Sequence, residues 1–182
     1  MKFPYGISDF DKIITNHYFY IDRTDRIPLL EEAGEHLLFL RPRRFGKSLL
    51  LSMLENYYDL AKASQFDQLF GHLAIGKQPT PKHNQYFVMK WDFSMVKAHS
   101  ETNALEAALH RHLNSQIQDF AMKYQTWLPL AVAIEPLDAL VSFQSALTAV
   151  QQTPYLLYLL IDEYDNFANQ VLMGHGLAHQ PQ

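Results

Sequence analysis

The stretch FLRPRRFGKSLLL, residues 39–51, constrains the fold of this chain more than any other part of the sequence. It joins a run of apolar residues, HLLFL at 36–40, to a segment in which apolar residues recur every three or four positions from Lys47 onward. The first pattern is typical of a strand covered on both faces, and the second of an amphipathic helix. The sequence therefore predicts strand, loop and helix in that order, which is the arrangement that a phosphate-binding loop requires.

The predicted loop carries the groups that a phosphate site needs. Gly46 lets the backbone approach a phosphate oxygen closely, Lys47 brings a positive charge to the outer phosphates, and the Ser48 hydroxyl can ligate Mg²⁺. The start of the following helix adds partial positive charge from its backbone N–H groups. The residues predicted to bind the nucleotide are Arg43, Arg44, Phe45, Gly46, Lys47 and Ser48.

Arg41 stands where the usual phosphate-loop pattern begins with glycine. Arginine lacks the freedom of glycine at positive φ, so the chain is expected to enter this loop differently. The alternative interpretation is a basic turn that caps the helix, with its arginines solvated or paired with surface acids. The flanking strand and helix patterns favour the phosphate-binding interpretation.

A second signal lies in PYLLYLLIDEYD, residues 154–165, where an apolar strand pattern ends in acids. The carboxyl end of a strand is the edge at which open α/β sheets bind ligands. We expect Asp162 to hold Mg²⁺ opposite Ser48, and Glu163 to act as the catalytic base that accepts a proton from the attacking water. The alternative for this stretch is an acidic strand end or a helix cap.

The rest of the chain alternates between strand and helix patterns. Strand patterns occupy residues 18–21 and 86–94, and helix patterns occupy residues 25–34, 105–120 and 137–150. Pro136 is expected at the first helical position of the last helix. This order predicts an α/β fold with an open, mostly parallel sheet flanked by helices, organised as one domain.

Composition limits the classes of function. The formal net charge of -4 gives no overall attraction to nucleic acid or to an acidic membrane. The absence of cysteine excludes disulfides, thiolate zinc sites and cysteine catalysis. The apolar runs are much shorter than the roughly 20 residues that span a bilayer. We therefore expect a cytoplasmic protein that makes no membrane contact.

Three stretches together resemble the AAA-ATPase-like family of bacteria and archaea: residues 4–24, residues 39–54 and residues 159–169. This is a P-loop NTPase family whose members often carry a C-terminal PD-(D/E)XK nuclease-like domain. The resemblance implies ATP and Mg²⁺ as the ligands, Lys47 as the nucleotide-binding and catalytic lysine, and Asp162 and Glu163 as the Walker B aspartate and the catalytic glutamate. Nucleic acid enters only as an association of that family.

The chain also departs from the family pattern. It has Asp-Arg-Thr at residues 22–24, where the family has Asp-Lys-Thr, and it ends at Gln182, soon after Glu163. The resemblance implies a further core strand with a polar sensor residue, a helical lid and often the nuclease-like domain. We therefore expect a lead-in segment at residues 1–34 and a partial ATPase core at residues 35–182, truncated after Walker B.

The expected function is binding of Mg-ATP, with hydrolysis left open. A second hypothesis is a switch module that binds nucleotide without hydrolysing it and acts on a protein partner or on a missing C-terminal domain. A third is an inactive fragment of a larger ATPase-nuclease-like protein.

Two weaker signals complete the survey. Tyr18, Phe19 and Tyr20 could stack on adenine, although packing in a sheet is the commoner use of such residues. His110 and His112 are expected on a solvated helix face, because residues two apart on a helix diverge.

Overall fold

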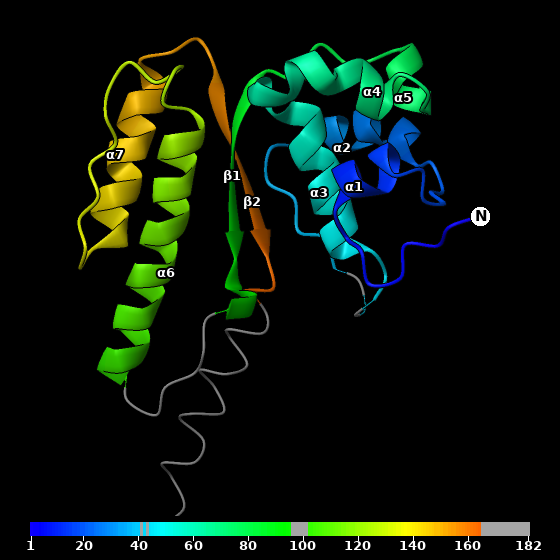
Figure 1. The fold of residues 1–182 in the computed structure, drawn as a ribbon. Coiled ribbons are helices and arrows are strands. Elements are labelled where there is room, and N and C mark those ends of the chain that lie inside the picture. The colour runs from blue at the N-terminus through cyan, green and yellow to red at the C-terminus, as the bar shows by residue number, and fades with distance from the viewer. Residues whose placement is uncertain (41, 43, 96–101, 165–182) are drawn as a thin grey trace, which may run out of the picture. The chain divides into compact units, whose positions relative to one another are not determined.

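The computed structural model describes residues 1–40, 42, 44–95 and 102–164 (Figure 1). The chain divides into two compact units, Met1–Tyr86 and Phe87–Gln182. Each unit is described below by itself.

The described residues of the first unit form helices joined by loops. In chain order these are α1 (Phe10–Thr15), η1 (Thr24–Arg26), α2 (Ile27–Ala33), α3 (Lys47–Tyr58), η2 (Leu60–Gln65), α4 (Phe66–Phe70) and α5 (Ala74–Lys77). The start of α1 is set by Asp9, whose Oδ1 accepts a hydrogen bond from Lys12 N at 3.1 Å. The helices predicted from residue 47 onward and within residues 25–34 are confirmed.

An aromatic cluster forms the core of the first unit. The Phe10 and Phe70 rings stack with centroids 5.0 Å apart, and Tyr57 meets Phe70 edge-on at 5.3 Å. All three side chains are fully buried. Because Phe10 opens α1 and Tyr57 lies on α3, this cluster packs α1 against α3 and α4 (Figure 1).

The Asp-Arg-Thr triplet at residues 22–24 is hydrogen-bonded to the start of α5. Asp22 Oδ1 accepts hydrogen bonds from Thr24 N at 2.9 Å and Thr24 Oγ1 at 2.7 Å, and Asp22 Oδ2 accepts one from Ala74 N at 2.7 Å. The fully buried Thr24 also accepts from Ile75 N at 3.1 Å. Burial alone would raise the pKa of Asp22, but the hydrogen bonds from Thr24 and Ala74 outweigh burial and lower it.

The second unit contains β1 (Tyr86–Asp92, whose first residue closes the first unit), η3 (Phe93–Met95), α6 (Thr102–Lys123), α7 (Ala139–Gln151) and β2 (Leu156–Asp162). The two strands pair and run in the same direction (Figure 1). Parallel strands need a long crossover connection, and α6 and α7 supply it. These helices pack on each other, and α7 also contacts β2. The predictions of an α/β architecture, of strands within residues 86–94 and 154–165, and of these two helices are confirmed.

Tyr124 anchors helix α6 to strand β1. Its ring is fully buried and meets the Phe87 ring edge-on, with centroids 5.0 Å apart. Its hydroxyl oxygen accepts a hydrogen bond from Val88 N at 2.9 Å. One side chain thus fills the core and also satisfies a strand N–H group that would otherwise be buried without a partner.

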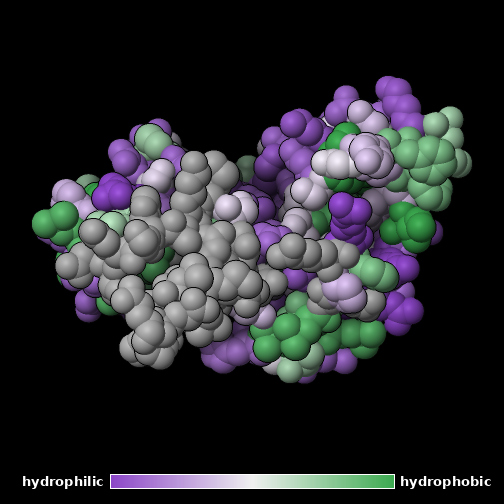
Figure 2. Space-filling view, turned by 90° about the horizontal axis from the view of Figure 1, so that it is seen from below, coloured by the Kyte–Doolittle hydropathy of each residue, from purple (hydrophilic) through white to green (hydrophobic). Residues whose placement is uncertain are grey.

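The prediction of a strand at residues 36–40 is wrong. These residues form neither helix nor strand, and Leu37, Leu38 and Leu40 are 48%, 69% and 71% exposed. A strand needs a neighbouring strand to satisfy its N–H and C=O groups, and this run has none among the described residues. The sheet of the described chain is accordingly the pair β1–β2, smaller than the open, mostly parallel sheet that was expected. Apolar side chains on the first unit are visible as green surface in the right half of Figure 2.

Two further expectations need correction. Residues 18–21 form no strand, since Tyr18 makes only an isolated bridge with Lys2. Pro136 is not the first residue of α7, because Asp138 is the N-cap and its Oδ1 accepts from Leu140 N at 2.9 Å. The carboxylate of Asp138 binds the free N–H groups at the helix start, so the helix begins after it.

Candidate nucleotide-binding site

The loop before α3 bends sharply just ahead of the helix. Gly46, the N-cap residue, has φ 78° and ψ 21°, in the left-handed region that glycine adopts without strain. Arg44 is also left-handed, at φ 68°, which is uncommon for a residue with a side chain. Left-handed residues can turn neighbouring backbone N–H groups toward one point, where they bind an anion. This loop has two such residues, Arg44 and Gly46.

The first turn of α3 is open to an anion. No side chain of the described residues caps this 12-residue helix, and its first intrahelical hydrogen bond runs from Leu50 N to Gly46 O at 2.9 Å. The N–H groups of Lys47, Ser48 and Leu49 therefore have no intrahelical acceptor. Together with the helix dipole, equivalent to about half a positive charge at this end, they form the anion-binding end that a phosphate loop needs.

The charged side chains of the loop are available for a ligand. Lys47 is half-buried, and its ammonium makes no ion pair with the described part of the chain. Arg44 and Phe45 are exposed, Phe45 to 66%. Arg43, which was predicted to bind the nucleotide, lies outside the described residues, and so does Arg41. The described loop thus presents a cation and open N–H groups at the same helix end.

A polar stripe on α3 ties the loop to the N-terminal segment. Ser48, Ser52 and Asn56 recur at intervals of four residues and so share one face of the helix. Ser52 Oγ accepts a hydrogen bond from Phe10 N at 2.9 Å, and Asn56 Nδ2 donates to Ser52 O at 2.8 Å. Ser52 is only 8% exposed. The start of α1 is therefore fixed one helical turn beyond Ser48.

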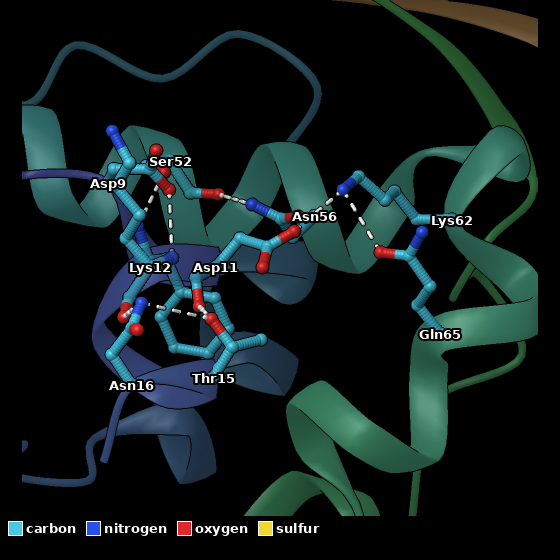
Figure 3. A network of polar contacts seen from close by, with 10 residues as sticks. Asp9, Asp11, Lys12, Thr15, Asn16, Ser52, Asn56, Lys62 and Gln65 are labelled. Carbon is cyan, nitrogen blue, oxygen red and sulfur yellow. Dashed lines mark hydrogen bonds and ion pairs between the residues drawn. The ribbon is translucent and has the colours of Figure 1, made fainter. Parts of the chain in front are cut away.

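Figure 3 shows these contacts together with a second link between α1 and the segment after α3. Lys62 Nζ lies 2.7 Å from Asp11 Oδ2 and donates to Gln65 Oε1 at 3.1 Å. About a third of each charged side chain is exposed (29% and 32%), so the ion pair contributes less to stability than the buried hydrogen bond of Ser52. Sequence reasoning missed Ser52 and Asn56, although their four-residue spacing after Ser48 was a visible signal.

The predicted magnesium ligand of the second unit lies at the end of β2. Asp162 is 6% exposed, and its Oδ1 accepts a hydrogen bond from Glu163 N at 3.0 Å. Among the described residues no other hydrogen bond to this carboxylate is present, and a buried carboxylate is stabilised by a cation or by further donors. The strand alternates as expected, since the preceding Ile161 is 42% exposed.

Glu163, the predicted catalytic base, has a strained backbone. Its φ is 55°, in the left-handed region that residues with a side chain rarely adopt. Such residues cost roughly 1–3 kcal/mol and cluster at active sites. The chain thus turns abruptly at the residue after Asp162, and Glu163 is half-buried.

The histidines of α6 are not simply solvated, contrary to expectation. His112 Nε2 lies 2.6 Å from Asp92 O at the end of β1. His110 Nδ1 accepts a hydrogen bond from Ala139 N at 3.0 Å, at the first residue of α7. Both side chains instead tie α6 to a neighbouring element, a role that helical spacing alone does not reveal.

The two halves of the predicted site belong to different units. Lys47 and Ser48 lie in the first unit, and Asp162 and Glu163 in the second. Their assembly around one triphosphate stays a prediction. Among the residues that the structure describes, no group of three or more His, Asp or Glu side chains is arranged to hold a metal ion. Nor does any helix in the described ranges have the length and apolar character of a membrane span.

The sequence matches a known protein family over nearly its whole length. The family described as "Predicted AAA-ATPase" matches residues 4–181. The chain belongs to this family. Membership supports a general ATPase-like role for the predicted AAA-ATPase, and it covers both the N-terminal segment and the loop before α3.

One relative of this predicted AAA-ATPase is described as an uncharacterized protein in the vnfD 5′ region of Azotobacter chroococcum mcd 1. The two are 45% identical over 58 residues, which is 31% of this chain and 11% of that protein. The match thus spans about a tenth of the relative's length. No solved structure matches the chain.

Proposed function

We propose that this chain binds Mg-ATP, with the triphosphate at the start of α3. The observation that carries the proposal is the first turn of this helix, which follows the left-handed Gly46 and has no side-chain cap from the described residues. It begins with Lys47, which makes no ion pair with those residues. Nucleotide triphosphates are recognised by such a combination of N–H donors, helix dipole and lysine. Family membership supports ATP as the nucleotide.

Lys47 and the N–H groups of α3 bind the β and γ phosphates, with Arg43, Arg44 and Phe45 in the same loop. Ser48 and Asp162 are the proposed ligands of Mg²⁺, which prefers hydroxyl and carboxylate oxygens. When bound, Mg²⁺ would supply positive charge that offsets the negative charge of the phosphates.

Hydrolysis would use Glu163 as general base. Its carboxylate accepts a proton from a water molecule whose oxygen forms the new bond to the γ phosphorus. The bond between that phosphorus and the β–γ bridging oxygen breaks, giving ADP and inorganic phosphate. The abrupt turn at Glu163 supports a positioned side chain at the end of β2.

The test is ATP binding and phosphate release by the purified chain in the presence of Mg²⁺. Lys47→Ala is compared with Lys77→Ala, an exposed lysine at the end of α5 in the same unit. Loss of a charge-assisted contact predicts that Lys47→Ala weakens ATP binding by about 10-fold or more, while Lys77→Ala binds like wild type. Unchanged affinity in Lys47→Ala would contradict the proposal.

Glu163→Gln separates hydrolysis from binding. The amide cannot accept the proton, so we expect ATP binding to persist and phosphate release to fall by at least about 100-fold. Binding with no Glu163-dependent phosphate release, in wild type as in the variant, would instead support a nucleotide-dependent switch acting on a partner.

A further inference from the structure

An open hollow on the surface of the first unit, called the cavity below, lies beside α1 and takes no part in the phosphate loop. Residues 6–9 line it together with Lys12, Asn16 and Tyr18, and its volume is about 520 Å³. Small-molecule sites in proteins are commonly about 300–1,000 Å³. The cavity is therefore large enough for part of a nucleotide.

The lining combines apolar surfaces with hydrogen-bonding groups. Ile7 and the Tyr18 ring supply apolar surface, and Ser8 and Asp9 supply polar atoms. Gly6, at φ 70°, has no atom within 4 Å of the place where a Cβ would lie, so the backbone there can be approached closely. A flat aromatic ring beside an aliphatic side chain is the surface on which nucleic-acid bases stack.

The cavity is held close to the phosphate loop by the polar stripe of α3. Phe10, which follows the cavity residue Asp9, is hydrogen-bonded through its N–H group to Ser52. Ser52 lies one turn after Ser48, a distance of roughly 6 Å along the helix axis. Asp9, which lines the cavity, is thus the neighbour in sequence of a residue that is held one helical turn from Ser48.

We propose that this cavity binds the adenine base of the nucleotide whose phosphates lie at α3, an inference that rests on the proposed function. One carboxylate oxygen of Asp9 caps α1 by accepting from Lys12 N, and the other has no partner among the described residues. An ionised carboxylate only accepts hydrogen bonds. Adenine offers it the N6 amino donor next to the N7 acceptor, whereas the same edge of guanine carries two acceptors.

Two neighbouring side chains complete the assignment. The Ser8 hydroxyl can donate to N7 beside Asp9, because it makes no side-chain hydrogen bond within the described chain. Lys12 makes no ion pair there either, which leaves its ammonium to the sugar-phosphate part of the nucleotide. Lys2 Nζ lies 5.9 Å from the centre of the Tyr18 ring, over one face, so the base would stack on the other face.

The experiment titrates the full chain with ATP, GTP and inorganic tripolyphosphate. The variants are Tyr18→Ala, the ring-preserving Tyr18→Phe, and Phe19→Ala as a matched control that removes the adjacent ring, which does not line the cavity. We expect Tyr18→Ala to weaken ATP about 10-fold or more while its tripolyphosphate affinity stays within about 2-fold of wild type. Tyr18→Phe and Phe19→Ala should bind ATP like wild type, and wild type should prefer ATP to GTP.

The outcomes separate this inference from the proposed function. If Lys47→Ala abolishes ATP binding but Tyr18→Ala binds ATP normally, the cavity assignment is wrong and the phosphate site stands. If Tyr18→Ala loses ATP and tripolyphosphate equally, the substitution acts on the fold and the assignment is also overturned. Equal affinity of wild type for ATP and GTP would contradict adenine recognition. Unchanged binding in Lys47→Ala would overturn the phosphate site itself.

Discussion

Replacing Ser52 by alanine tests whether its hydrogen bond to Phe10 holds the start of α1 against α3. Ser52 Oγ is the acceptor for Phe10 N at 2.9 Å, and Phe10 and Ser52 are 0% and 8% exposed. Phe10 is the first residue of α1, so its N–H group has no acceptor within its own helix. Alanine removes the hydroxyl and leaves that N–H group buried without a partner.

The expected magnitude follows from this geometry. An unsatisfied buried N–H group costs about 1–3 kcal/mol in the free energy of unfolding. For a chain of 182 residues this lowers Tm by roughly 2–4 °C for each kcal/mol. The measurement is urea unfolding and a thermal melt of Ser52→Ala beside Ser64→Ala, which removes an exposed hydroxyl from η2 in the same unit. The control should lie within about 0.5 kcal/mol of wild type.

The reasoning is refuted if Ser52→Ala and Ser64→Ala unfold at the same urea concentration. That result would mean that the Phe10 N–H group finds water or another acceptor at no cost. The start of α1 would then not be fixed by the polar stripe of α3, and the argument that places the cavity beside the phosphate loop would lose its main support.

Two further predictions concern hydrogen bonds that lie away from the nucleotide. The pKa of Asp22 is lower in the folded chain than its ordinary value of 3.8, so its contribution to stability is complete at pH values above 3.8 and is lost as pH falls through the lowered pKa. In Asp22→Asn, the free energy of unfolding should therefore fall less steeply than in wild type as pH drops below about 4. Urea unfolding at several pH values measures this. The same pH dependence in variant and wild type would contradict the hydrogen bonds from Thr24 and Ala74. Tyr124→Phe leaves Val88 N without the hydroxyl at 2.9 Å and should cost about 1–3 kcal/mol in unfolding free energy, whereas a variant as stable as wild type would count against that bond.

The helices could be predicted from the sequence because their signals are local. In α3 the apolar residues that recur every three or four positions include Met53, Leu54, Tyr57 and Tyr58, and all four are buried. An amphipathic pattern specifies its own period, and each helical residue finds its hydrogen-bond acceptor four residues away. The same holds for the helix patterns that became α2, α6 and α7.

The strands could be predicted less well because their hydrogen bonds depend on other segments. The apolar runs at residues 36–40 and 156–162 look alike in the sequence, yet only the second is a strand. Residues 156–162 have β1 beside them, and residues 36–40 have no strand partner in the described chain. A strand pattern states that a segment can pair but does not identify its partner.

What the sequence by itself determined is the chemistry of the loop and the helix that presents it. Glycine, lysine and serine follow one another there, and the backbone hydrogen bonds of the helix they begin join residues only four apart in the sequence. The tertiary structure decided which distant groups meet: Phe10 with Ser52, Asp22 with α5, and residues 6–9 with Tyr18 around one cavity. These contacts join residues far apart in the chain, so they depend on packing in three dimensions that no local pattern encodes.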